Sequence, residues 1–272
     1  MDYILYEVRD RVSVITLNRP DRRNAQNKQL LVELDEAWQK AADDKETRVI
    51  VVKANGPHFS AGHDIARDEG YEAKIKDYLG DLKNVGVRDL YCWEGHYYLG
   101  FCRKWRDVPK PSIAAVQGAC VAGGLMLAWP CDLIVAAENA KFSDPVVRMG
   151  IGGVEYHGHT WEFGARKAKE MLFTGGAIDA REAERLGMVN RVVAVEQLEE
   201  STMALANQIA EMHPFALAMA KRSVNQTLDI MGQYAALQAA FDTHALAHAS
   251  ALAQTGEPVL MGLSGLKTAN KG

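Results

Sequence analysis

The chain has 272 residues, with 31 Lys and Arg against 35 Asp and Glu, which gives a formal net charge of −4. This length fits one large domain or one and a half. A chain of this size buries enough apolar surface to fold without disulfide bonds or structural metal ions. Hydrophobic residues make up 48% and charged residues 24%, values that exclude wholesale disorder. The near-neutral balance lacks the basic excess typical of nucleic-acid or anionic-membrane binding, so we expect neither partner.

The four cysteines form no C-x-x-C pair, so the usual spacing of zinc and thioredoxin-type sites is missing. Charged residues interrupt the first ten positions, unlike a signal peptide. No apolar run approaches the ~20 residues needed to cross a bilayer. We therefore expect a cytoplasmic protein with reduced thiols.

The sequence of the first part of the chain predicts a hairpin, a helix and a buried strand. The β-rich runs Tyr3–Glu7 and Val12–Leu17 flank a polar turn. Apolar residues that recur every three or four positions predict an amphipathic helix over 27–42. The apolar run Arg48–Lys53, which ends at an Asn-Gly-Pro loop, predicts a buried strand.

The same order returns in the middle of the chain. Ile113–Val116 and Leu133–Ala137 predict strands, and Gly123–Trp129 between them predicts a short helix. Strands that alternate with helices are typical of a parallel or mixed sheet covered by helices, so the expected fold class is α/β.

Two segments differ from this pattern. Residues 65–90 are charged and weakly periodic, with a weak helix near 72–83, and suggest a surface insert. After Val195 the chain is rich in Ala, Leu and Gln. The helices expected there are Leu198–Met212, Phe215–Met231 and Gln233–Gln254. We therefore divide the chain into a β/α core, residues 1–195, and a helical region, residues 196–272.

Two loops rich in small residues follow apolar strands, Phe59–Ile65 (FSAGHDI) and Gln117–Leu125 (QGACVAGGL). Glycine lets a backbone approach a ligand closely, and a helix start leaves N–H donors unpaired. Two such donors that converge would stabilise a developing oxyanion. Taken alone, each loop is better interpreted as a tight turn, and neither is a nucleotide-binding motif.

In combination these loops and several further segments carry a family resemblance. The segments are Asn18–Pro20 with Asn24–Ala25, Phe59–Ile65, Lys110–Gly118, Cys131–Ala137, Lys141–Ser143 and Ala183–Asn190. With them the chain resembles the crotonase superfamily, the enoyl-CoA hydratases and isomerases, along nearly its whole length.

The resemblance implies a crotonase-like spiral of ββα units followed by a C-terminal helical oligomerisation region, assembled as homotrimers or as hexamers made of two trimers. It also implies an acyl-CoA thioester as substrate, with no cofactor and no metal. The thioester oxygen would lie between the backbone N–H groups of His63 and Gly123, and the His63 side chain need not act.

The resemblance also implies a CoA path along the first loop. The positions carried over for the adenosine and pantetheine groups are Asn24, Ala25, Ala61 and Ile65. The CoA phosphates need positive charge, for which Arg22, Arg23 or Lys267 is available. Each of these three is equally consistent with a solvated surface cation.

The family pattern breaks at its acid/base positions. Hydratases of the family use two glutamates, and here those positions hold Met126 and Val146. A third position, an aspartate in dienoyl isomerases and dehalogenases, is Val154. Met126, Val146 and Val154 are therefore expected to line the acyl site without moving protons.

Glu155 follows Val154 directly and is the candidate for a displaced acid/base residue, with His157 or Tyr156 as its partner. The alternative is a glutamate that faces solvent or pairs with an arginine. His157 and His159 resemble half of a metal site that nothing nearby completes. Asp144 is interpreted as a cap or turn residue.

A cluster of aromatic and titratable residues precedes Lys104, on a helix that borders the acyl pocket in the family. Its members are Tyr91, Trp93, Glu94, His96, Tyr97 and Tyr98. Glu94 or His96 is a second source for the missing chemistry, and a surface role is the alternative for each.

The function expected is that of an acyl-CoA enzyme that stabilises a thioester enolate, with weak simple hydration. Decarboxylation, isomerisation and thioester hydrolysis remain alternatives on the same fold. The first loop also resembles that of methylmalonyl-CoA decarboxylase, a reaction that needs an oxyanion hole and the apolar pocket that Met126 and Val146 would form. A non-catalytic acyl-CoA-binding oligomer is the alternative from another class.

Overall fold

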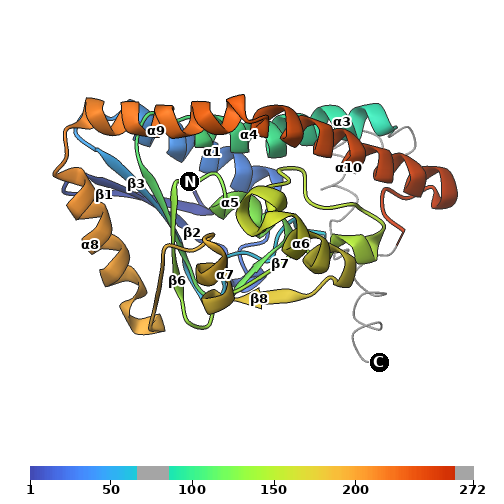
Figure 1. Ribbon diagram of the computed structural model, residues 1–272, viewed down its shortest axis with the longest axis horizontal. Coiled ribbons are helices and arrows are strands. Elements are labelled where there is room, and N and C mark those ends of the chain that lie inside the picture. The colour runs from blue at the N-terminus through green and yellow to red at the C-terminus, as the bar shows by residue number, and fades with distance from the viewer. Residues whose placement is uncertain (66–85, 261–272) are drawn as a thin grey trace.

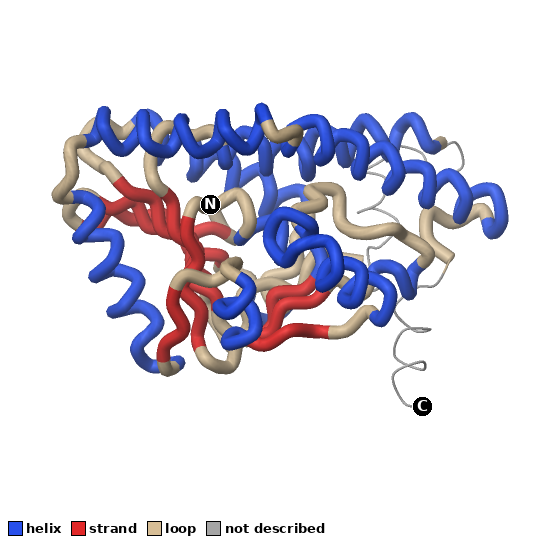
Figure 2. Tube along the Cα trace, viewed as in Figure 1, coloured by secondary structure: helices blue, strands red, loops and turns tan. Residues whose placement is uncertain are grey.

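The computed structural model describes residues 1–65 and 86–260. Two sheets are enclosed by helices (Figures 1 and 2): a six-stranded sheet in the order β1-β2-β3-β4-β6-β9 and a three-stranded sheet in the order β5-β7-β8. The strands are β1 Ile4–Arg9, β2 Val12–Leu17, β3 Val49–Ala54, β4 Ser112–Val116, β5 Ala119–Val121, β6 Leu133–Ala137, β7 Lys141–Ser143, β8 Ala177–Asp179 and β9 Arg191–Val193.

The large sheet begins with the predicted hairpin. Strands β1 and β2 pair antiparallel, and Asp10 in the turn has a φ of 54°, a conformation that Asp tolerates better than most residues. The pairs β2–β3, β3–β4, β4–β6 and β6–β9 are all parallel. The predicted mixed α/β architecture and the early strands are therefore confirmed.

The helices also follow the expected order. They are α1 Lys28–Asp43, α3 Val87–Glu94, α4 Phe101–Arg106, α5 Leu125–Ala128, α6 His159–Thr174, α7 Ala180–Leu186, α8 Leu198–Ala210, α9 Pro214–Ile230 and α10 Gln233–Thr255. The Asn27 side chain caps α1 by accepting the Leu30 N–H at 2.9 Å. The predicted helix near 72–83 and most of the predicted insert lie outside the described residues, and residues 87–90 belong to α3.

Apolar side chains cover both faces of the large sheet. All residues of β2 and β4 are buried, as expected for strands packed on two sides. Helix α8 covers one face: Leu205 and Ala206 pack with Val49 and Ile113. Helix α1 packs against β1 and β2 on the other face with Trp38 fully buried. The first helix after residue 195 thus belongs to the packing of the sheet.

The last two helices run along one side of the molecule (Figure 1), and α10 contacts both α3 and α9. Helix α9 buries none of its residues, whereas α10 buries several, including His244 and His248. Helix α10 therefore brings side chains from the end of the chain to α3. None of the helices in 1–65 and 86–260 is both long and apolar enough to span a membrane.

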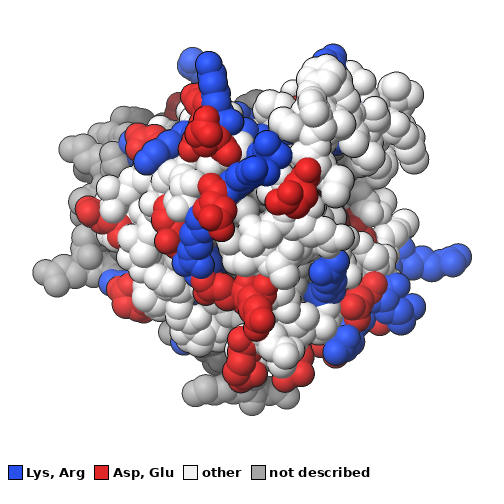
Figure 3. All heavy atoms as spheres, turned by 90° about the vertical axis from the view of Figure 1, so that its left-hand side faces the viewer, with Lys and Arg blue, Asp and Glu red and all other residues white. Residues whose placement is uncertain are grey.

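Charges on the face seen in Figure 3 are mixed in sign, with basic and acidic side chains side by side. Arg9 forms ion pairs with Glu7 and Glu199, and Lys53 also binds Glu199. Opposite charges in contact largely cancel their long-range field. This face therefore presents no large patch of one sign.

Candidate functional site

The two glycine-bearing loops meet in space. Ser60 accepts the Val121 N–H at 3.0 Å and donates its own N–H to Ala119 at 3.1 Å, so the loops pair like short parallel strands. Gly62 has a φ of +88°, and a Cβ at that position would lie 2.8 Å from the Val121 oxygen. Only glycine fits there, because both the backbone conformation and the close approach exclude a side chain.

Two backbone amides lie at this junction, those of His63 and Gly123. The Cβ built on Gly62 would be 3.1 Å from the Gly123 nitrogen, which places the second loop directly against the residue before His63. Within 1–65 and 86–260, neither the His63 nor the Gly123 N–H donates to a protein acceptor. Gly123 also lies in the first turn of the helical segment that continues into α5, where N–H groups are left free. Both donors thus remain available to a ligand oxygen.

The His63 imidazole lies between Gly123 and a buried carboxylate. Its ring stacks on Tyr98, with centroids 3.9 Å apart and planes 20° apart. Its Nε2 lies 3.1 and 3.2 Å from the two carboxylate oxygens of Glu155. Its Nδ1 is buried, has no hydrogen-bond partner in the described part of the chain, and lies 2.7 Å from where a Cβ on Gly123 would be.

Glu155 is 2% exposed and contacts two histidines. Its second neighbour is His244, whose Nε2 lies 3.6 Å from Oε1. Burial is the largest influence and opposes ionisation, but the charges of His63 and His244 outweigh it and lower the pKa of Glu155. An ionised carboxylate only accepts hydrogen bonds, so His63 Nε2 carries the proton.

This pairing corrects the expected partner of Glu155. Neither His157 nor Tyr156 supplies it, and His63 does, because the first loop crosses in front of the glutamate. Burial raises the pKa of Tyr156. Burial, with the neighbouring His159, lowers the pKa of His157 to about 4. The solvent-facing alternative for Glu155 is also wrong.

Behind Glu155 lies a buried cluster of Glu94, His244 and His248. Glu94 is 7% exposed, which contradicts the surface alternative for this residue, while His96 is exposed. Burial opposes the ionisation of Glu94, but His244 and His248 lower its pKa to about 2. Burial likewise opposes protonation of His244, yet Glu155 and Glu94 raise its pKa to about 9.

The predicted CoA-path residues surround the first loop. Asn24 is buried, and its side chain accepts the Arg19 N–H and donates to the carbonyls of Asn55 and His58. Gln26 pairs with His63, which places Ala25 beside this loop. Ala61 donates its N–H to Arg23, and Ile65 is exposed. Lys267 lies outside the described residues.

Apolar residues occupy the two positions at which hydratases of the family have glutamates. Met126 in α5 is 1% exposed, Val146 packs on the same core, and Val154 is buried in the loop before Glu155. Asp144 accepts the N–H of Val146, two residues on, and that of Val154, as expected of a turn residue. Its carboxylate lies 3.0 Å from His159 Nε2.

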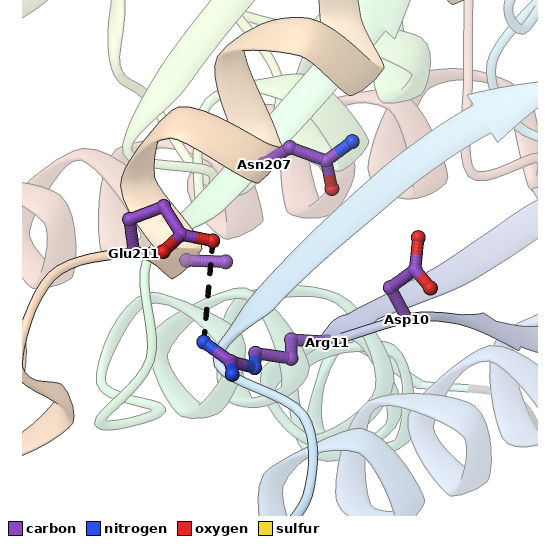
Figure 4. Close-up of a pocket in the computed structure, with 5 residues that line it drawn as sticks. Asp10, Arg11, Asn207 and Glu211 are labelled. Carbon is purple, nitrogen blue, oxygen red and sulfur yellow. Dashed lines mark ion pairs between the residues drawn. The ribbon is translucent and has the colours of Figure 1, made fainter.

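A surface hollow of about 260 Å³ lies elsewhere, between the β1–β2 turn and the end of α8 (Figure 4). Arg11 and Glu211 approach to 4.0 Å across it, and Asp10 and Asn207 complete its polar lining. It includes none of the predicted site residues, and its charged pair is solvent-exposed. Within the described part of the chain, the predicted site residues at the loop junction therefore lie apart from this hollow.

His244 and His248 were not predicted as part of the site. The sequence signal that would have found them is their spacing of four residues, which places two imidazoles on one helical face. Glu94 was considered only for its place among aromatic residues. The cluster thus joins two helices that are far apart in the sequence.

Comparison with known proteins gives the family. Residues 7–257 match the family model described as enoyl-CoA hydratase/isomerase. The protein EchA13 of Mycobacterium tuberculosis, provisionally named an enoyl-CoA hydratase, is 45% identical over 258 residues, which cover 91% of this chain and 81% of the relative. The chain is therefore an enzyme of the enoyl-CoA hydratase/isomerase family, within the crotonase superfamily.

Solved structures agree with this assignment. The crystal structure of a probable enoyl-CoA hydratase from Mycobacterium smegmatis is 56% identical, has a TM-score of 0.89 and covers 96% of this chain and 100% of its own. That of a probable enoyl-CoA hydratase from Mycobacterium thermoresistibile is also 56% identical, with a TM-score of 0.88 and coverages of 94% and 99%. The crotonase fold expected from the sequence is thus confirmed.

Proposed function

We propose that the protein acts on an acyl-CoA thioester and stabilises its enolate with the N–H groups of His63 and Gly123. The support is the junction of the two loops, where both amides lack a protein acceptor among the described residues. A thioester oxygen that gains negative charge is stabilised by two preorganised donors, each typically worth about 3–4 kcal/mol. The proposal calls for no cofactor beyond the CoA of the substrate.

The proton at the substrate α-carbon is moved by the Glu155–His63 pair, which takes the place of the two family glutamates. The observation that carries this proposal is the contact of His63 Nε2 with both Glu155 oxygens, at 3.1 and 3.2 Å. Glu155 orients the ring through this hydrogen bond, and the ring lies next to Gly123. His63 thus acts through both its amide and its imidazole.

The CoA moiety extends along the first loop. Ala61 and Ile65 line the pantetheine path, and the turn at Asn24 and Ala25 supports the adenosine, with Arg22 or Arg23 near the phosphates. Met126, Val146 and Val154 form the acyl wall. Because this wall carries no polar group that could orient a water molecule, it favours reactions in which the enolate is protonated by the Glu155–His63 pair or rearranged over addition of water.

Assembly as a homotrimer, or as two stacked trimers, belongs to the same proposal. The support is helix α9 and its end, where Phe215, Val224, Ile230 and Met231 are 60–87% exposed. Several strongly exposed large apolar side chains on one helix are typical of a surface covered by another subunit. Mass photometry of the purified chain would show three or six chains per particle; monomers would contradict this part of the proposal.

A panel of thioesters tests the reaction. We expect kcat/KM for crotonyl-CoA hydration to be at least about a hundredfold below that of a two-glutamate relative, because each acid/base group contributes about 10²–10⁴. Dienoyl, β,γ-enoyl and malonyl-type thioesters separate isomerisation and decarboxylation from hydration. Hydration at the relative's rate would refute the conclusion that the apolar wall disfavours addition of water. Thermal stabilisation by CoA esters with no turnover of any would instead indicate the non-catalytic binder.

A further inference from the structure

The buried cluster of Glu94, His244 and His248 is not used by the proposed reaction. Glu94 ends α3, and the two histidines lie one turn apart on α10. Within the cluster, Nε2 of His244 and Nε2 of His248 are 3.0 Å apart. Each of these nitrogens is also 3.4 Å from one oxygen of Glu94. Four potential ligand atoms on three side chains therefore converge on one point.

The other ring nitrogens fix how the two histidines are protonated. His244 Nδ1 lies 2.7 Å from the Gly153 carbonyl oxygen, and His248 Nδ1 lies 2.6 Å from that of Pro258. A carbonyl only accepts, so both Nδ1 atoms carry protons and donate them. In the neutral rings the Nε2 lone pairs then point into the cluster. A carbonyl behind each imidazole is the arrangement that orients metal-binding histidines.

A single proton cannot serve all the hydrogen-bond acceptors of this cluster. A proton on His244 Nε2 serves one acceptor, whereas His248 Nε2, Glu94 and Glu155 all lie within 3.6 Å of that nitrogen. No atom of residues 1–65 and 86–260 forms a hydrogen bond with Glu94 Oε2, although this oxygen is fully buried. Leaving a buried carboxylate oxygen unpaired is costly. One cation at the centre would satisfy all of these atoms together.

We propose that Glu94, His244 and His248 bind a divalent first-row metal ion, with Zn²⁺ as the best match. Tetrahedral zinc has bonds of about 2.0–2.1 Å to imidazole nitrogen and carboxylate oxygen, which place its ligand atoms about 3.3–3.4 Å apart. The ligand separations here, 3.0 and 3.4 Å, lie close to that edge length. Two imidazoles and a carboxylate are a ligand set that zinc uses widely.

The ion would fasten α10 to α3 and to the loop that carries Glu155. His244 donates to Gly153, two residues before Glu155, and its Nε2 is 3.6 Å from Glu155 Oε1. Glu155 or a water then fills the fourth position. The role inferred is to hold the wall behind the proposed proton-transfer pair, and metal binding does not depend on which reaction the enzyme performs.

Metal analysis of tag-free protein tests the inference. After dialysis against chelator and reloading with Zn²⁺, we expect close to one ion per chain by mass spectrometry, and a thermal midpoint that rises with zinc and falls back with EDTA. Co²⁺ in its place should give the visible absorption of a tetrahedral nitrogen–oxygen site. Zinc content far below one per folded chain, with no change in thermal midpoint, would overturn the inference and leave a proton-bridged histidine pair.

Matched variants locate the ion. His248→Gln keeps a polar side chain at the site and should abolish both the stoichiometric uptake and the zinc-dependent rise in thermal midpoint. His213→Gln changes an exposed histidine outside the cluster and should retain both. Equal zinc uptake by the two variants, each shown to be folded by circular dichroism, would place the ion elsewhere and refute the assignment. Neither readout requires a substrate, so failure here leaves the proposed function untouched.

Discussion

The interior of the six-stranded sheet and the wall of the candidate site are both buried. The first consists mainly of apolar side chains, whereas the second contains ionisable ones. Strands β2 and β4 bury every residue, and the hydroxyls of Ser13 and Ser112 form hydrogen bonds with Thr47 and Asp132. The site wall instead buries Glu94, Glu155 and two histidines. Ionised groups are costly to bury, so they are retained where each neutralises another.

The two regions also differ in how the chain assembles them. The inner strands β2, β3 and β4 are short, largely apolar runs, each paired with neighbours of the same kind. The titratable side chains of the site come from four separate segments: the first loop, α3, the loop before α6, and α10. Stability and chemistry should therefore respond to different substitutions, and the predictions below test this separation.

The largest effect is expected from Glu155→Gln. Glutamine is similar in size but cannot hold a charged His63, so turnover of the best substrate should fall about 100- to 10,000-fold. His63→Phe keeps the stack on Tyr98 and the backbone N–H while it removes both ring nitrogens, and should cause a similar loss. Steady-state kinetics on both variants measure the effect.

A double variant shows whether the two residues act together. If Glu155 and His63 form one proton-transfer unit, the double variant should be no slower than the worse single variant. Additive losses would separate their roles. Unchanged turnover in Glu155→Gln, with circular dichroism matching the unsubstituted protein, would remove Glu155 from the mechanism.

In the sheet, Ile113→Ala should lower the stability of the protein and leave its turnover unchanged. Ile113 is fully buried in β4 and packs under α8, so the cavity should lower the free energy of unfolding by about 2–5 kcal/mol. Urea denaturation measures this loss, and turnover per folded molecule should stay unchanged. Ile113→Val, expected to cost about 0.5–1.5 kcal/mol, is the graded control. A loss of turnover that exceeds the loss of folded protein would show that the sheet and the site are coupled.

Most of the sheet and its covering helices could be predicted from the sequence because their signals are local. Helix α1 has a three-to-four residue repeat with Asn27 as its cap, and β3 is an apolar run that ends at a turn. Such patterns follow from the geometry of one element. The division at residue 195 remains a prediction, since α8 beyond it packs on the sheet.

The site was predictable only in part. Proximity in the sequence suggested His157 as the partner of Glu155. Contacts between loops depend on how the chain folds in three dimensions, and the residue that contacts Glu155 is His63. Helix α10 is rich in alanine and apolar residues around its whole circumference, so no stripe marked the face that carries His244 and His248. The composition of the segment predicted that helix without its orientation.

A moderate effect is expected at the loop junction from Gly123→Ala. The added Cβ would lie 2.6 Å from His63 Cε1, so the ring must move while both amides remain. Displacing a catalytic group in this way should lower kcat by at least about tenfold. The matched control is Gly152→Ala, whose Cβ would meet no atom within 4 Å. Equal activity of the two variants would show that the His63 ring position does not matter.

The smallest effect concerns a buried carboxylate of the sheet region. Glu33 accepts the N–H groups of Tyr3 and Ile4 at 2.8 and 3.1 Å and so ties α1 to β1. Burial, the largest influence, opposes its ionisation, but the hydrogen bonds from Gln29 and from the backbone lower its pKa. Glu33→Gln weakens these charge-assisted bonds and should cost about 1 kcal/mol at neutral pH by urea denaturation.

The pH dependence of that difference sharpens the contrast with Glu155. A pKa that is lower in the folded than in the unfolded state stabilises the fold above the unfolded pKa, and the contribution disappears as the pH falls through the folded pKa. The stability gap between the unsubstituted protein and Glu33→Gln should therefore close in acid, while kcat at neutral pH stays the same in both. A gap that persists in acid would mean that packing, and not charge, accounts for the stabilisation by Glu33. A fall in kcat would show that this carboxylate, too, supports the chemistry of the site.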